Sequence, residues 1–98
     1  MANWSIYLVK CRDDSLYAGI ALDVEKRMLE HQGGKRGAKY LRGRGPLTLA
    51  FSREVGERGL ALKVESRIKK LSRKAKLDLV KHPEKAKKII SACRGQDS

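Results

Sequence analysis

The stretch SIYLVKCRDDSLYAGI, residues 5–20, decides the fold because two strand-like segments in it surround one acidic turn. Residues 5–11 are rich in β-branched and aromatic side chains, and residues 16–20 have a similar character. Residues 12–14, Arg-Asp-Asp, favour a turn between them. The stretch therefore predicts a β-hairpin near the start of the chain.

The length of this turn decides whether Tyr7 and Tyr17 share a face of the sheet. Side chains alternate between the two faces of a strand. A two-residue loop would place the two phenols on opposite faces, whereas a three-residue loop at residues 12–14 places both on one face. Such a loop combines a type I turn with a left-handed residue, a conformation that Asp14 tolerates better than most residues. We predict the three-residue loop and a shared face.

Beyond the hairpin, the sequence predicts a helix, a strand and then more helices. Asp23 is suited to cap a helix that runs to about Gln32, which Gly33 and Gly34 would end. Residues 47–55 alternate as a third strand, and residues 57–71 repeat apolar side chains at helical spacing.

Two further helices are expected toward the end of the chain. Ser72 is suited to cap a helix through about Lys81, and Pro83 suits the first position of the last helix. The last helix has an apolar stripe that either covers the core of the domain or docks a partner, and it consists of Ala86, Ile89, Ile90 and Cys93.

The element order is β-β-α-(α)-β-α-α-α, where the bracketed helix is one short turn around residues 38–41. This order favours an α+β fold that resembles a sandwich, with a small three-stranded, mainly antiparallel sheet flanked by helices. A chain of 98 residues predicts a single domain over residues 1–98. We expect its core at residues 4–71 and a C-terminal helical extension at residues 72–94.

The charge of the chain points to a polyanionic partner. Lys and Arg number 23 against 11 Asp and Glu, which gives a net charge of +12. Nucleic acid, DNA above all, is the expected partner because clustered cations release the counterions of phosphates. No membrane partner is expected, since no apolar run approaches the ~20 residues that a membrane-spanning helix needs. No small-molecule cofactor is expected either. Cys11 and Cys93 lack metal-ligand spacing, and without a signal peptide we expect free thiols and a cytoplasmic location.

Several residues along the chain resemble the signature of the GIY-YIG nuclease superfamily. Its first triplet matches at residues 5–7 (Ser-Ile-Tyr) and its second at residues 17–19 (Tyr-Ala-Gly). Arg27 follows where this family places a catalytic arginine, His31 stands where His or Tyr is common, and Glu65 stands where a metal-binding glutamate belongs. The likeness covers about residues 4–71, and residues 37–46 look like the small stand-alone bacterial branch.

The resemblance implies a metal-dependent endonuclease that hydrolyses phosphodiester bonds in DNA, selects structure rather than sequence, and acts in DNA repair or processing. Glu65 would hold Mg²⁺ or Mn²⁺, because Mg²⁺ binds readily through few protein ligands. Arg27 would clamp the phosphate. Tyr17 would be the general base or orient the water, Tyr7 would support it, and His31 would accept a hydrogen bond or a proton from a tyrosine.

A basic, glycine-rich segment close in sequence to these residues supplies candidates for contacts with nucleic acid. They are Lys35, Arg36, Lys39, Tyr40, Arg42 and Arg44. Two alternatives stay open. Ile20 stands where some active members have a lysine, which favours a weakly catalytic or non-catalytic nucleic-acid-binding module. Glu65 could also form a surface ion pair with Lys69, four residues on.

Overall fold

The computed structural model describes residues 3–33 and 46–95. In chain order the elements are β1 (Trp4–Lys10), β2 (Leu16–Ala21), α1 (Val24–Gly33), β3 (Thr48–Gly56), α2 (Arg58–Lys69), α3 (Arg73–Lys81), the 3₁₀ turn η2 (Pro83–Lys85) and α4 (Ala86–Gly95). The α+β class and the predicted order are confirmed, while the helical turn expected around residues 38–41 lies outside the described residues. No helix in these ranges is long and apolar enough to cross a bilayer.

The hairpin turn has the predicted length and conformation. The Cys11 N–H donates to the Ser15 carbonyl at 2.9 Å, so residues 12–14 form the loop. The Asp14 N–H donates to the Cys11 carbonyl at 2.9 Å, and Asp14 has a φ of 66°. Asp14 therefore occupies the left-handed position of the loop, as its short polar side chain permits.

The register that follows from this turn places both hairpin tyrosines on one face. In the antiparallel pair of β1 and β2, Tyr7 lies opposite Gly19 and Val9 lies opposite Tyr17. Directly opposite residues point to the same face of a sheet. The prediction of a shared face is confirmed.

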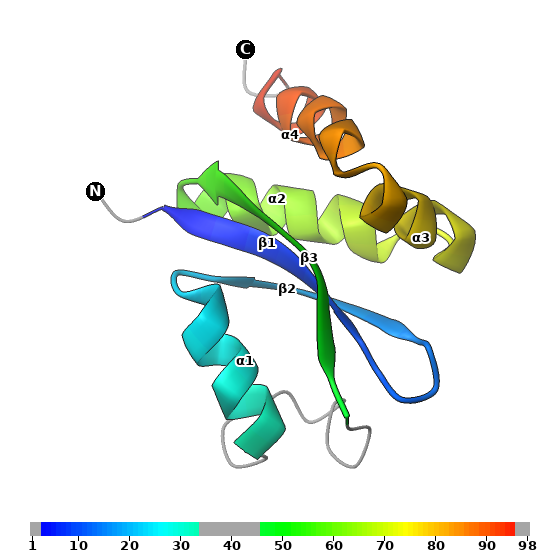
Figure 1. The fold of residues 1–98 in the computed structure, drawn as a ribbon. Coiled ribbons are helices and arrows are strands. Elements are labelled where there is room, and N and C mark those ends of the chain that lie inside the picture. Colours follow the sequence, from blue (N-terminus) through cyan, green and yellow to red (C-terminus); the bar gives the residue numbers. More distant parts are fainter. Residues whose placement is uncertain (1–2, 34–45, 96–98) are drawn as a thin grey trace.

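The three strands form one antiparallel sheet in the order β2-β1-β3, so β1 is central and β2 is an edge strand. Figure 1 shows α1 against one face of this sheet and α2, α3 and α4 against the other. The face toward α2 buries Ile6 and Leu8, and the face toward α1 buries Tyr7 and Val9. Each face therefore has its own core, and β1 contributes to both.

Both predicted helix caps are present. The Asp23 Oδ1 accepts from the Lys26 N–H, and the Ser72 Oγ accepts from the Ala75 N–H, each at 3.1 Å. The helix expected at residues 57–71 ends slightly early, at Lys69. Its last turn tightens, because the next two N–H groups bond to carbonyls three residues back.

The C-terminal helices pack on the chain's own core. Pro83 does begin a helical segment, but as the short turn η2, which leads into α4. The predicted stripe of α4 faces inward, with Ala86, Ile90 and Cys93 buried in the same cluster as Ile6. This stripe covers the core, so it is not a docking surface. The boundary between a core at residues 4–71 and an extension at residues 72–94 stays a prediction.

Candidate functional site

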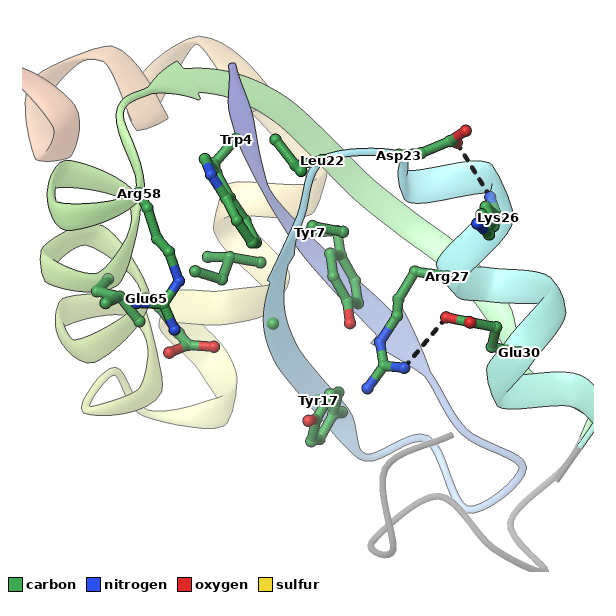
Figure 2. Close-up of a pocket in the computed structure, with 14 residues that line it drawn as sticks. Trp4, Tyr7, Tyr17, Leu22, Asp23, Lys26, Arg27, Glu30, Arg58 and Glu65 are labelled. Carbon is green, nitrogen blue, oxygen red and sulfur yellow. Dashed lines mark hydrogen bonds and ion pairs between the residues drawn. The ribbon is translucent and has the colours of Figure 1, made fainter. Parts of the chain in front are cut away.

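An open hollow of about 530 Å³ lies at the edge strand β2, between α1 and α2. Tyr7, Tyr17, Arg27 and Glu65 all line it, although they come from four different elements (Figure 2). The structure therefore brings together four of the side chains to which the resemblance gave roles. Their chemical roles are a separate question.

The residues reach the hollow from both sides of β2. Tyr7, Tyr17 and Arg27 approach from the face covered by α1, and Figure 2 shows Glu65 on the other side of the β2 ribbon. Glu65 belongs to α2, whose inner side packs on the opposite face of the sheet. The hollow thus wraps around the sheet edge, and the carboxylate joins the phenols only because α2 and α1 flank the same strand.

Gly19 makes room for the Tyr7 ring. A Cβ added at Gly19 would lie 2.5 Å from the Tyr7 Oη and 2.6 Å from its Cζ. Real Cβ atoms essentially never approach other atoms so closely, so any side chain here would displace the phenol. The glycine of the second triplet therefore serves the tyrosine of the first, a close approach that sequence reasoning treated only as a motif match.

Tyr7 and His31 form a buried polar pair. The Tyr7 Oη lies 2.9 Å from the His31 Nε2, and the two side chains are 1% and 4% exposed. Burial and the nearby Arg27 cation lower the pKa of His31. Burial raises the pKa of Tyr7. Both groups are therefore neutral near pH 7, and one ordinary hydrogen bond joins the phenol oxygen to the imidazole nitrogen.

His31 also contacts the second phenol. Its ring centroid lies 6.0 Å from that of Tyr7 and 5.9 Å from that of Tyr17, the latter in an edge-on arrangement with an interplanar angle of 77°. The imidazole therefore fixes the positions of both tyrosine rings. From the sequence, His31 was expected to accept a hydrogen bond or a proton from one tyrosine, and not to contact both rings.

The protein alone does not favour a phenolate at either tyrosine. Burial is the main cause that raises the pKa of Tyr17, and the Glu65 carboxylate raises it further, while Arg27 acts in the opposite direction. At Tyr7, burial likewise outweighs the lowering effect of a hydrogen bond with Arg27. The Arg27 cation favours the phenolate at both tyrosines, but burial has the larger effect.

Arg27 is held toward the hollow by a neighbour on its own helix. Its Nη1 donates to the Glu30 Oε1 at 3.2 Å, in a partly buried ion pair. Burial lowers the pKa of Arg27, but the hydrogen bonds with Glu30 and Tyr7 outweigh it, so the net shift is upward. Glu30 also lines the hollow. Sequence reasoning did not single out Glu30, although its spacing of three residues from Arg27 is a signal that could have indicated this pair.

Glu65 does form the expected pair with Lys69, but the pair is loose. The Lys69 Nζ lies 3.8 Å from the Glu65 Oε2, and the Lys69 side chain is 53% exposed. Within the described ranges, no group of three or more His, Cys, Asp or Glu side chains could enclose a metal ion. One carboxylate beside an open hollow fits a Mg²⁺ ion that keeps most of its water ligands. The donor set therefore suits Mg²⁺ or Mn²⁺ and not a closed structural site.

Some predicted contacts cannot be placed, and some residues of the hollow were missed. The six basic-segment candidates, Lys35, Arg36, Lys39, Tyr40, Arg42 and Arg44, lie outside the described residues. The hollow has two cations that sequence reasoning did not single out, Lys26 and Arg58, and one indole, that of Trp4. No local pattern marks Trp4 or Arg58, because their proximity comes from packing between β1 and α2.

The fold and the hollow together define a class: a small α+β domain whose phenols, guanidinium and single carboxylate suit the chemistry of phosphate esters. Comparison with known proteins agrees. Residues 3–78 match the model of a family described as the GIY-YIG catalytic domain. The chain belongs to the GIY-YIG family, and its fold is of the nuclease type.

Its relatives in this family carry names that state no specific function. A "UPF0213 protein" of Citrobacter koseri is 49% identical over 92 residues, which is 94% of this chain and 91% of that protein. The UPF0213 protein YhbQ of Salmonella arizonae is 48% identical over the same shares of both chains.

Two solution NMR structures have the same fold. A UPF0213 protein from Bacillus halodurans has 38% identity and a TM-score of 0.52, over 87% of this chain and 93% of that one. A protein from E. faecalis has 34% identity and a TM-score of 0.58, over 83% of this chain and 85% of that one. The expected small stand-alone branch of the family is confirmed by these relatives.

Proposed function

We propose that this protein is a metal-dependent endonuclease that hydrolyses phosphodiester bonds in DNA and selects structure rather than sequence, as in DNA repair or processing. The observation that carries the proposal is the convergence of Tyr7, Tyr17, Arg27 and Glu65 on one open hollow. The net charge of +12 supports a polyanionic substrate. A hollow of this size would contact the DNA backbone at one point and reach few base edges. This supports the selection of substrates by DNA structure and not by sequence.

Arg27 is the residue that binds the scissile phosphate in this proposal. Its guanidinium has five N–H donors in a planar fork. The bond to Glu30 fixes the direction of the fork. The cation then stabilises negative charge as it grows on the phosphoryl oxygens.

Tyr17 orients the attacking water. Its raised pKa keeps the phenol protonated at neutral pH, so its oxygen can accept a hydrogen bond from water but is a poor base by itself. When bound at Glu65, Mg²⁺ or Mn²⁺ would supply Lewis-acid stabilisation and make a nearby water more acidic. Neutralising Glu65 would also remove the second cause that raises the pKa of Tyr17. Tyr7 and His31 form a supporting pair that can take up a proton.

The decisive experiment compares two glutamates of the same region. Labelled duplex, flap, junction and single-stranded DNA are incubated with the protein and Mg²⁺ or Mn²⁺, with and without chelator. Glu65→Gln should lower the cleavage rate at least about 100-fold, a loss typical of a group that stabilises transition-state charge. Glu57→Gln changes the net charge equally at the start of α2, where the side chain makes no cap bond, and should leave the rate unchanged.

The tyrosine roles can be separated in the same assay. Tyr17→Phe preserves packing and removes the hydroxyl, so an unchanged cleavage rate would exclude its proposed role. Tyr7→Phe removes the hydroxyl that pairs with His31, and a smaller loss is expected because Tyr7 acts through positioning.

A second candidate function is a nucleic-acid-binding module with little or no catalysis. Ile20 favours it, because this apolar side chain lines the hollow at a place where a cation would help the chemistry. Binding with a steep salt dependence and no metal-dependent cleavage of any DNA structure would support this candidate over the endonuclease.

A further inference from the structure

The hollow contains more than phosphate chemistry requires. At the end away from Tyr17, its lining becomes apolar, with Trp4 and Leu22 (Figure 2). Leu62 also lines the hollow. Leu22 is 52% exposed and Leu62 is 37% exposed. A single exposed apolar side chain is common on protein surfaces and needs no explanation. Several of them together in a hollow are typical of a binding site.

A planar cation lies beside the indole at this end. The Arg58 Cζ is 5.6 Å from the centroid of the Trp4 ring, within the range of a cation–π contact. Trp4 also packs on the buried cluster beneath α2, so its ring is held in place by the core. Figure 2 shows Trp4 and Arg58 close to each other, on the same side of β2 as Glu65.

The helix α2 brings the apolar end and the carboxylate together. Arg58, Leu62 and Glu65 are four and three residues apart, which places them along one face of the helix. A ligand that contacts Glu65 through its phosphate side can therefore reach Arg58 and Trp4 with the group next to that phosphate. An indole, a guanidinium plane and two leucines suit the flat, largely apolar faces of a nucleobase.

Resting on the proposed function, we propose that this end of the hollow is a base subsite, which takes an unstacked nucleobase from the nucleotide next to the scissile phosphate. The subsite consists of Trp4, Leu22, Arg58 and Leu62. In a continuous duplex both faces of every base are already stacked, so such a base is not available. The substrates are therefore nucleic acids with an unpaired nucleotide beside the cleaved bond, such as single strands and flaps.

The charge of the molecule and the continuity of the hollow favour a nucleobase over other apolar occupants. The same hollow contains Arg27 and Lys26, and the chain has a net charge of +12. A purely apolar ligand would make no use of these cations. A nucleotide supplies the flat base and the anion within one connected unit, and its size suits a pocket of several hundred Å³.

Trp4 is the only tryptophan of the chain, so its fluorescence reports directly on this end of the hollow. The full-length Glu65→Gln variant, without added metal, is titrated with a single-stranded oligonucleotide and with an abasic strand of the same length. Binding is followed independently through a label on each strand. Base stacking contributes about 1–3 kcal/mol, so the base-containing strand should bind about 5- to 150-fold more tightly and should quench Trp4.

Two exposed positions give variants with little risk of unfolding. Leu22→Ser and Arg58→Gln should each reduce the ratio of the two affinities toward one. The matched controls are Leu29→Ser, at a leucine that is 69% exposed outside the hollow, and Arg67→Gln, at an exposed position of α2 outside the hollow. Both controls should preserve the ratio, even where the loss of a charge weakens binding to both strands.

The outcomes separate this inference from the proposed function. Equal affinities for the two strands, or quenching by the abasic strand as strong as by the base-containing one, would overturn the base subsite even in an enzyme that cleaves DNA. A high ratio that Leu22→Ser and Arg58→Gln reduce would support the subsite even if no metal-dependent cleavage is found. No binding of either strand would overturn the base subsite, whereas the cleavage assay of the wild-type protein with metal decides the proposed function.

Discussion

The core beneath α2, α3 and α4 consists of buried apolar side chains, whereas the core beneath α1 contains a phenol hydrogen-bonded to an imidazole. His31 is the one buried polar or charged residue among those that the structure describes, and it lies under α1. The candidate chemistry also draws most of its groups from that side. The face of the sheet under α2, α3 and α4 therefore mainly stabilises the fold, and the face under α1 positions the polar groups of the candidate site.

The largest effect should come from the aliphatic core. Ile68→Ala removes a fully buried side chain of α2, and the free energy of unfolding should fall by about 2–5 kcal/mol. Urea denaturation monitored by circular dichroism measures this change. Leu29→Ala, at the exposed surface of α1, is the control and should change stability by less than about 0.5 kcal/mol. Similar losses at both positions would contradict the assignment of stability to the α2 face.

A pair of glycines tests the polar face next. Gly19→Ala forces a Cβ against the Tyr7 ring, and such overpacking should cost about 1–3 kcal/mol and lower any cleavage rate at least tenfold. Gly59→Ala is the matched control, because its Cβ would meet nothing within 4 Å in α2. That control should stabilise the protein by about 0.5–1 kcal/mol, since alanine favours helices. Equal effects of the two substitutions would show that Tyr7 tolerates displacement.

The pH dependence of stability should also come from the polar face. The pKa of His31 is lower in the folded chain than its usual value of 6.5, so the unfolded chain binds more protons there. Stability should therefore be full above about pH 6.5 and fall as the pH decreases through the lowered pKa. Urea midpoints between pH 5 and pH 8 measure this dependence.

His31→Gln is the variant for the same titration, and it should flatten the acid side of the curve. The groups that face His31 include Tyr7, Arg27 and Glu30, and a slope that persists in this variant would contradict the assignment of the titration to His31. The raised pKa values of Tyr7 and Tyr17 predict a second loss of stability, as the pH rises above about 10.

The smallest effect is expected at the ion pair of Glu65 and Lys69, which are both on α2. Lys69→Met removes the exposed partner of Glu65, and the free energy of unfolding should change by less than about 0.5 kcal/mol. The amount of Mg²⁺ needed for half-maximal cleavage should fall slightly or stay the same. A large loss of stability would instead mean that Glu65 serves a structural ion pair.

The parts of this molecule that could be predicted from its sequence depend on local rules. The three-residue loop at residues 12–14 sets the strand register that places Tyr7 and Tyr17 on one face. Asp14 adopts the expected left-handed conformation, and Asp23 and Ser72 cap their helices as expected. These outcomes depend on neighbours within a few residues. The element order followed from the same kind of pattern.

The features that escaped prediction depend on packing between distant segments. Trp4 meets Arg58 across two elements of opposite type. The resemblance implied a hydrogen bond from a tyrosine to His31, but it did not say that the partner is Tyr7, 24 residues away. Glu65 was expected at the site only through the family resemblance, because its approach around the sheet edge depends on where α2 lies and no spacing rule states that position. The irregular register of β1 and β3 beside Trp4 is of the same kind.

The placement of the hollow at β2 has a consequence for the behaviour of concentrated protein. A border strand with unpaired backbone groups invites the addition of a strand from another molecule, which is a common route to aggregation. Here that border also lines the hollow where a polyanion is proposed to bind. Self-association through this edge and occupancy by DNA should therefore exclude each other, so a short oligonucleotide should delay precipitation of the purified protein.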